Sequence, residues 1–309
     1  MKHSLKITLL LLSFFIFSQI FGLFIISQDM NVVKDDQGNN INVTYAKTVI
    51  GERPEMEPKD SFISIIIAIG IGTLLALLLI KFNLFKIWNI WFFIAVFISI
   101  SVSLGVFFND TLAFLLAFIL TLLKNKKPNL LTHNLSELLI YPGITLIFAP
   151  LLNLYWIIIL LLVISIYDMY AVWHSKHMIK LAEFQSSSDK FAGFMIRYDN
   201  KDKLKQTKKV KSKTTKKVKT ESRRAVLGGG DVFFPLLFSG ILLQHIILVN
   251  NLDKLFAFLL CLIITIFTTI SLSLLFYYSK KDRYYPAMPF ISGGCFLGLI
   301  VVKLIIYFI

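Results

Sequence analysis

The sequence has little cysteine and few charged residues. Its two cysteines, Cys261 and Cys295, both lie in apolar stretches, where we interpret them as small packing residues. Two such cysteines give neither a framework of disulfides nor a metal site. Charged residues make up 16% of the chain and hydrophobic residues 56%, whereas soluble domains are about 45–50% apolar. The excess of apolar residues is too large for the core of one soluble domain.

The apolar residues are grouped in runs of about 20, the length that crosses the hydrocarbon region of a bilayer. Together with a mean hydropathy of +0.74, these runs predict an all-α, multi-pass integral membrane protein with nine transmembrane helices. Whether this is the cell membrane or an endomembrane is left open. The predicted helices cover residues 5–26, 61–80, 87–108, 111–123, 135–149, 153–174, 225–249, 254–278 and 287–307. The fourth is short, and the fifth contains Glu137 and is interrupted by Pro142-Gly143.

The first apolar run also resembles a secretory signal peptide, because basic residues precede it. However, it is long for such a segment, and no small-x-small cleavage site follows Ile26. We therefore predict that it is retained as a helix.

The net charge of +14 is concentrated in one stretch, which contains sixteen of the 32 Lys and Arg residues, between Lys176 and Arg224. A basic loop between apolar spans is typical of orientation by the positive-inside rule and argues against nucleic acid as a partner. With nine spans, this bias predicts a cytosolic N-terminus and a C-terminus outside.

We expect three parts in the chain. Residues 1–174 hold six helices, with an outer loop at 27–60 that carries a glycosylation sequon at Asn42. Residues 175–224 form a basic cytosolic loop, which we predict to be disordered because like charges at this density repel. Residues 225–309 hold the last three helices. The sequence does not decide whether Asn42 is glycosylated or whether the loop is cut for activation.

Two acidic residues lie within predicted spans, where a charge is costly and therefore indicates a functional site. Asp168 lies six residues from the cytosolic end of the sixth predicted helix, and Asp231 lies six residues inside the seventh. Six residues correspond to about 9 Å of helix, so the two carboxylates are expected at the same depth.

Two neighbouring carboxylates share one proton and titrate as a pair. In aspartic proteases one carboxylate of such a pair activates water while the other protonates the carbonyl oxygen, without a metal or cofactor. An ion pathway or proton relay through a transporter or channel is the alternative at this point.

Glycines and a proline segment flank this pair. Gly228, Gly229 and Gly230 precede Asp231 and permit close approach of a peptide backbone, although a simple hinge has the same composition. A phosphate-binding loop is disfavoured, because no Walker-type lysine follows and no strand is evident before the glycines. The segment Pro286-Ala287-Met288 opens the last predicted helix, where proline fits the first turn.

In this order and in these spans, the motifs resemble those of the presenilin and signal peptide peptidase family of intramembrane aspartyl proteases. Tyr167-Asp168 is similar to the family's Tyr-Asp motif and Gly228-Gly229-Gly230-Asp231 to its Gly-x-Gly-Asp motif. Pro286-Ala287-Met288 resembles its Pro-Ala-Leu motif, with Met in place of Leu. The resemblance covers residues 153–309 by motif and the whole chain by the number of helices. It is strongest to microbial presenilin homologues.

The resemblance implies that Asp168 and Asp231 are catalytic and that the other motif residues, listed next, bind substrate. These are Tyr167, Gly228, Gly229, Gly230, Pro286, Ala287 and Met288. It further implies substrates that are single transmembrane helices, held partly as an extended strand, and it leaves open accessory subunits or an oligomer. A prepilin peptidase is disfavoured because no Lys follows Asp231 closely. A transporter is disfavoured because no internal repeat is evident, and a scaffold subunit remains the other non-enzymatic alternative.

Overall fold

The computed structural model describes residues 5–126, 129–175, 191–198, 223–279 and 285–308. Within these ranges nine α-helices make up most of the chain, as the sequence predicts, and their ends lie within a few residues of the predicted ones. They are α1 (Leu5–Asp29), α2 (Pro58–Lys81), α3 (Phe85–Gly105), α4 (Asp110–Lys126), α5 (Leu130–Phe148), α6 (Leu154–Trp173), α9 (Gly229–Val249), α10 (Lys254–Tyr278) and α11 (Met288–Tyr307).

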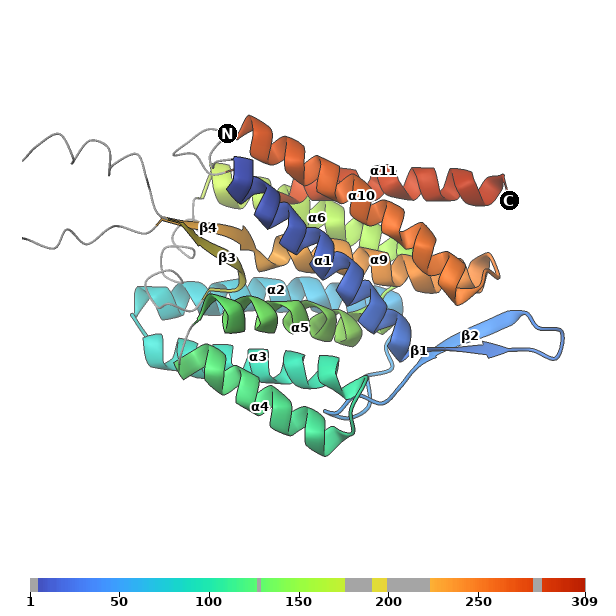
Figure 1. The fold of residues 1–309 in the computed structure, drawn as a ribbon, viewed down its shortest axis with the longest axis horizontal. Coiled ribbons are helices and arrows are strands. Elements are labelled where there is room, and N and C mark those ends of the chain that lie inside the picture. Colours follow the sequence, from blue (N-terminus) through green and yellow to red (C-terminus); the bar gives the residue numbers. More distant parts are fainter. Residues whose placement is uncertain (1–4, 127–128, 176–190, 199–222, 280–284, 309) are drawn as a thin grey trace, which may run out of the picture.

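Eight of the nine described helices are long and apolar enough to cross a membrane. The exception is α4, whose 17 residues extend over about 25 Å. It nevertheless lies beside α3 and α5, roughly along the same direction (Figure 1). α1 begins at one end of the bundle and α11 finishes at the other, as expected for an odd number of helices that cross the same layer.

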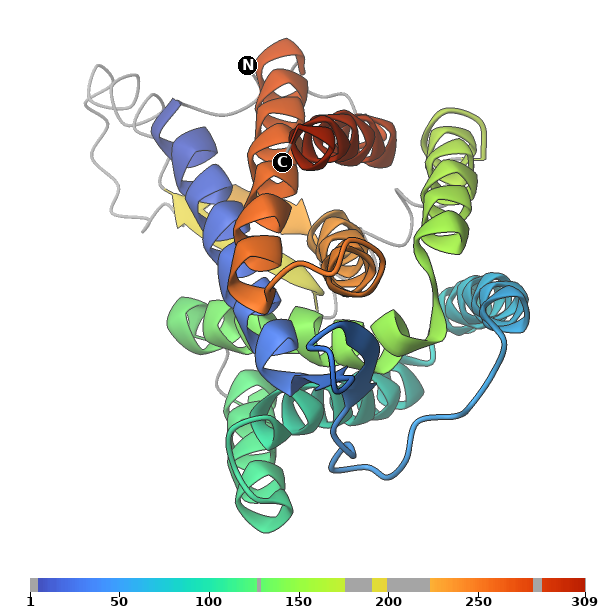
Figure 2. The ribbon, with the colours of Figure 1, turned by 90° about the vertical axis from the view of Figure 1, so that its right-hand side faces the viewer.

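The helices form groups that can be followed when the bundle is viewed along its length (Figure 2). α3, α4 and α5 pack together on one side, while α1, α10, α9 and α11 pack on another. α6 and α2 complete the bundle. In the most apolar stretch of each helix, 67% of the residues of α9 are buried within the protein, whereas only 6% of those of α2 are. α9 is therefore central, and α2 lies at the periphery with most of its residues uncovered by the rest of the protein.

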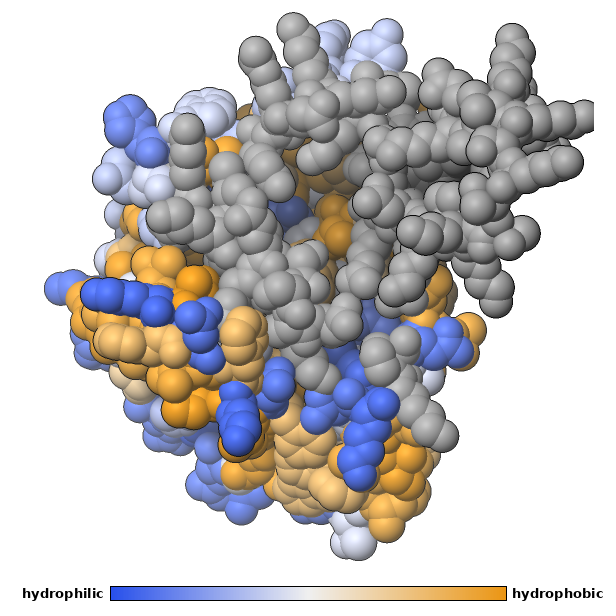
Figure 3. All heavy atoms as spheres, turned by 90° about the vertical axis from the view of Figure 1, so that its left-hand side faces the viewer, coloured by the Kyte–Doolittle hydropathy of each residue, from blue (hydrophilic) through white to orange (hydrophobic). Residues whose placement is uncertain are grey.

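Two β-hairpins lie at opposite ends of the bundle (Figure 1). β1 (Met30–Lys34) pairs antiparallel with β2 (Asn40–Tyr45), and β3 (Gly193–Tyr198) pairs antiparallel with β4 (Arg223–Gly228). At the end that carries β3 and β4, hydrophilic side chains lie next to hydrophobic ones (Figure 3), as expected where helices leave an apolar layer.

The second hairpin corrects three expectations. Disorder was predicted for all of 175–224, but residues 193–198 form β3. The seventh helix was expected from residue 225 with no strand before the glycines, yet residues 223–228 form β4 and the helix begins at Gly229. The physical reason is a pairing between two strands with 24 residues between them in the sequence, which buries Phe194 and Leu227 and has no local signal. Residues 176–190 and 199–222 lie outside the described residues.

The first hairpin is fixed to the helices by polar contacts. Arg53 forms an ion pair with Asp29 at the end of α1, at 2.7 Å, and Lys254 Nζ donates to the Met30 carbonyl at 2.9 Å. Tyr45 donates its hydroxyl to Gln244 Oε1 on α9 at 2.9 Å. Burial raises the pKa of the Tyr45 hydroxyl well above its usual range, so it remains a donor at neutral pH. These polar contacts thus hold the first hairpin and the residues next to it against the helices at the end of the bundle opposite β3 and β4.

Candidate active site

Asp168 and Asp231 line one cavity of about 560 Å³ inside the bundle. Its walls come from α2, α5, α6 and α9, from the residues just before β3, and from the segment that leads into α11. The lining is mainly apolar, so the two acids are its main ionisable groups.

Asp168 lies in the second-last turn of α6 and is buried, with 7% of its surface exposed. The backbone N–H of Met288, the first residue of α11, donates to Asp168 Oδ2 at 3.1 Å. The first N–H groups of a helix have no partner within the helix and carry partial positive charge, so this contact stabilises a carboxylate. Nearby, Ser165 and Ser292 hydrogen-bond at 2.8 Å and hold α6 against α11.

Asp231 is the third residue of α9 and lies in its first turn, half-buried. It was expected six residues inside this helix, and the difference arises because residues 225–228 belong to β4. The Asp231 carboxylate lies beside Gly228, the residue that caps the helix, because a Cβ atom at Gly228 would be 3.0 Å from Asp231 Oδ2. Each acid of the pair therefore lies at the start of a helix, Asp168 against the first residue of α11 and Asp231 within the first turn of α9.

The glycines differ in how tightly they are packed. A Cβ atom at Gly228 would lie 3.0 Å from Asp231 Oδ2, and one at Gly229 would lie 3.2 Å from the Tyr141 hydroxyl. A Cβ at Gly230 would only make ordinary contact with Phe234, at 3.7 Å. Close packing against the site thus favours glycine at the first two positions, and all three residues line the cavity.

The other motif residues are divided between the cavity wall and the layer behind it. Tyr167, Ala287 and Met288 line the cavity, and the Tyr167 hydroxyl contacts Thr73 Oγ1 of α2 at 3.4 Å. Pro286 is buried but does not line the cavity. It sits next to the residues that do, where its fixed backbone precedes the first turn of α11.

Sequence reasoning missed Tyr141 of α5, which lines the same cavity and lies within the electrostatic reach of Asp231. Its hydroxyl donates to Glu137, one turn earlier on the same helix. The signal was present, because Glu137 is an acid within a predicted span and such residues mark functional regions. What the sequence did not show is that this face of α5 is directed toward the glycines of α9.

The described residues contain no group of three His, Cys, Asp or Glu side chains placed to bind a metal ion. Cys261 on α10 and Cys295 on α11 are both fully buried, away from the cavity lining.

A family model described as signal-peptide peptidase, presenilin aspartyl protease matches residues 59–307. The chain belongs to this family. It is accordingly an intramembrane aspartyl protease and a multi-pass integral membrane protein, as the motifs predict. The match extends from α2 to α11 and so includes every element that lines the cavity.

Two solved structures of presenilin family intramembrane aspartate proteases have a similar fold. The first, in space group C222, is 16% identical with a TM-score of 0.57, and the alignment covers 96% of this chain and 99% of that one. The second, in space group P2, is 18% identical with a TM-score of 0.50, with 96% of each chain covered. At these identities the likeness concerns the fold alone. A comparison with curated proteins gave no match.

Proposed function

We propose that this presenilin-family protease hydrolyses peptide bonds within transmembrane segments, using a water molecule activated by Asp168 and Asp231. The observation that carries the proposal is the presence of both carboxylates, one from α6 and one from α9, on the wall of one mainly apolar cavity. Family membership supplies the aspartyl protease chemistry but does not itself identify these two residues.

The reaction needs one proton shared between the two carboxylates. The ionised carboxylate takes a proton from water while the oxygen of that water forms a bond to the scissile carbonyl carbon. At the same time, the protonated carboxyl group gives its proton to the carbonyl oxygen. The tetrahedral intermediate then breaks its C–N bond, and the nitrogen receives a proton from the first carboxylate. The second recovers its own proton from the intermediate, so the pair ends in its starting state.

The residues around the pair supply the substrate site in this proposal. Tyr167, Ala287, Met288 and the three glycines line the cavity beside the acids, where an unwound peptide can approach closely. Pro286 acts from behind the wall by fixing the start of α11. A substrate held partly as an extended strand has a neighbour in the β3–β4 hairpin, which leads directly into α9.

We further propose the membrane orientation that the Lys and Arg bias favours, with the N-terminus in the cytosol and the C-terminus outside. The division of the chain into residues 1–174, 175–224 and 225–309 belongs to the same proposal, since the first part supplies Asp168 and the last supplies Asp231. Protease protection of a C-terminal tag in sealed vesicles of known sidedness tests the orientation. Digestion of the tag from the cytosolic side contradicts this orientation.

The catalytic assignment is tested with the full chain in proteoliposomes that contain a single-span reporter. Asp168→Ala and Asp231→Ala should each abolish cleavage, while Asp110→Ala, an exposed acid in the first turn of α4, serves as the matched control. Cleavage at the wild-type rate by either active-site variant refutes the assignment. Ion flux through the wild-type chain without any cleavage would instead support the transporter alternative.

A further inference from the structure

The two-stranded sheet of β3 and β4 has two outer edges, and its register shows which backbone groups face outward. Gly193 pairs with Gly228 and Met195 with Val226, while the Gly229 N–H donates to the Ala192 carbonyl at 3.2 Å. In an antiparallel ladder that bond identifies these two pairs as non-hydrogen-bonded ones. The N–H and C=O groups of Gly193 and Met195 therefore point away from β4.

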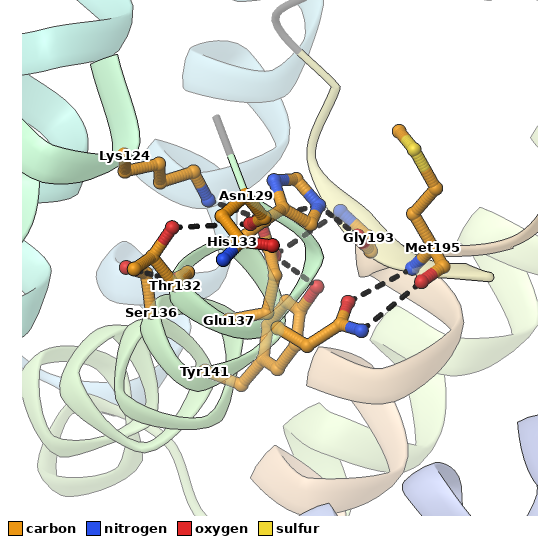
Figure 4. Close-up of polar contacts among 10 residues, drawn as sticks. Lys124, Asn129, Thr132, His133, Ser136, Glu137, Tyr141, Gly193 and Met195 are labelled. Carbon is orange, nitrogen blue, oxygen red and sulfur yellow. Dashed lines mark hydrogen bonds and ion pairs between the residues drawn. The ribbon is translucent and has the colours of Figure 1, made fainter. Parts of the chain in front are cut away.

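Polar side chains of α5 take up all four of these outward groups. The Asn134 amide accepts from the Met195 N–H and donates to its carbonyl, each at 3.0 Å. Glu137 Oε2 accepts from the Gly193 N–H at 3.1 Å, and His133 Nε2 donates to the Gly193 carbonyl at 2.8 Å. Figure 4 shows these contacts converging on Gly193 and Met195 from one helix. The three side chains thus take the place of a neighbouring strand.

Glu137, at one end of this row of side chains, has two further partners. Glu137 is fully buried and forms an ion pair with Lys124 of α4, which is also buried (Figure 4). Glu137 also accepts from the hydroxyl of Tyr141, whose ring lines the catalytic cavity against Gly229. The hairpin is therefore tied through Glu137 to the outer helix α4 and to the wall of the catalytic cavity.

The other edge of the sheet is different. The same register makes the N–H and C=O of Val226 and Gly228 point outward from β4, and Gly228 lies beside the Asp231 carboxylate, whose Oδ2 would be 3.0 Å from a Cβ atom at this glycine. Among the described residues, no group pairs with the outward backbone of Val226. The edge beside the catalytic acids thus has backbone groups available for another strand.

We propose that His133, Asn134 and Glu137 are positioning residues for the protease reaction. By occupying the outer edge of β3 they leave β4 as the edge to which an extended substrate adds, and they fix the hairpin in one register relative to Asp168 and Asp231. A hairpin held less firmly presents the substrate backbone in more than one register, because strand pairing shifts in whole residues. This inference rests on the proposed function.

The direct test is Asn134→Ala, which removes both contacts to Met195. The matched control is Ser136→Ala, a buried residue on the same helix whose hydroxyl donates to the Thr132 carbonyl of its own helix. Products from a single-span reporter are identified by mass spectrometry, and kcat and KM are measured in proteoliposomes. Asn134→Ala should lower kcat/KM about tenfold and produce cuts at additional neighbouring bonds, while Ser136→Ala retains the wild-type products.

A role in stability alone reduces the amount of active enzyme without changing which bonds it cuts. An unchanged product distribution for Asn134→Ala therefore overturns the inference while leaving the proposed function in place. Loss of cleavage in Asp168→Ala and Asp231→Ala tests the proposed function separately. A wild-type chain that cleaves no membrane segment overturns both.

Hydrogen exchange of the wild-type chain provides a measurement that needs no variant. The outward N–H of Met195 should exchange about as slowly as that of Phe194, which lies within the ladder, and the outward N–H of Val226 should exchange faster. Equally fast exchange at Met195 and Val226 shows that α5 does not occupy the edge of β3 and overturns the inference.

Discussion

The backbone N–H of Met288 donates a hydrogen bond to Oδ2 of Asp168 over 3.1 Å, which joins the first residue of α11 to the second-last turn of α6. The contact gives the Pro-Ala-Met segment a role that does not depend on the Met288 side chain. It also explains how Leu and Met can replace each other in the motif, because both residues provide the same N–H and have similar volumes.

Met288→Pro removes this donor at a helix position where proline is otherwise tolerated. A hydrogen bond to a charged group contributes about 1.5–3 kcal/mol, so cleavage should fall roughly tenfold to a hundredfold. Met288→Leu, which keeps the N–H and nearly the same volume, is the control and should retain most activity. The rates are measured with a single-span reporter in proteoliposomes. Equal rates for the two variants would show that the bond has no part in catalysis.

Replacing both acids at once should cost little more than replacing one. Residues that act as a single catalytic unit are strongly non-additive, because the loss of either member already removes the shared step. Asp168→Asn and Asp231→Asn should each lower the rate at least about 10³-fold, and the double variant should match the slower single one. Single-turnover assays with excess enzyme provide the sensitivity. Multiplied losses in the double variant would indicate that the acids act independently.

Alanine substitutions should rank the three glycines. Gly228→Ala places a methyl group 3.0 Å from Asp231 Oδ2, and Gly229→Ala places one 3.2 Å from the Tyr141 hydroxyl, so both should impair cleavage. Gly230→Ala meets only ordinary contact and adds helix propensity of up to about 1 kcal/mol, so it should lose less activity and melt no lower. Cleavage rates and thermal melting in detergent are measured together. The prediction fails if Gly230→Ala is the most damaging of the three.

The buried pair of Lys124 and Glu137 should show strong coupling in unfolding. Lys124→Met leaves the Glu137 carboxylate buried without its cation, and breaking a buried pair in this way costs about 3–5 kcal/mol. Adding Glu137→Gln removes the unpaired charge and should recover part of that loss. A double-mutant cycle on thermal melting measures the coupling. Additive losses would mean that the two residues stabilise the fold separately.

Much of the fold could be predicted because membrane helices have a local signal. Runs of about 20 apolar residues located the helices, and the short fourth run corresponds to α4, which has 17 residues. The glycine, tyrosine and proline motifs also indicated the family, which the match over residues 59–307 shows. The catalytic roles of Asp168 and Asp231 stay a prediction, although both line one cavity.

The hairpin and its attachment to α5 could not be predicted. β3 lies close to a highly charged stretch, and the apolar pattern predicts a helix from residue 225, over most of its partner β4. Each strand has only six residues, and their pairing spans a loop whose length carries no information about register. Glu137 was noted only as a weakness of the fifth span, because its partners Lys124 and Gly193 come from other elements.

The sequence by itself determined the membrane class, the positions of the nine helices and the family, since each follows from short-range patterns of apolar residues and motifs. The tertiary structure alone decided that Asp231 lies in the first turn of α9, that Tyr141 of α5 lines the cavity, and that α5 occupies one edge of the hairpin. These features arise where residues far apart in the chain are brought together. Such contacts depend on how helix faces are rotated against each other, which apolar residues distributed around a membrane helix do not specify.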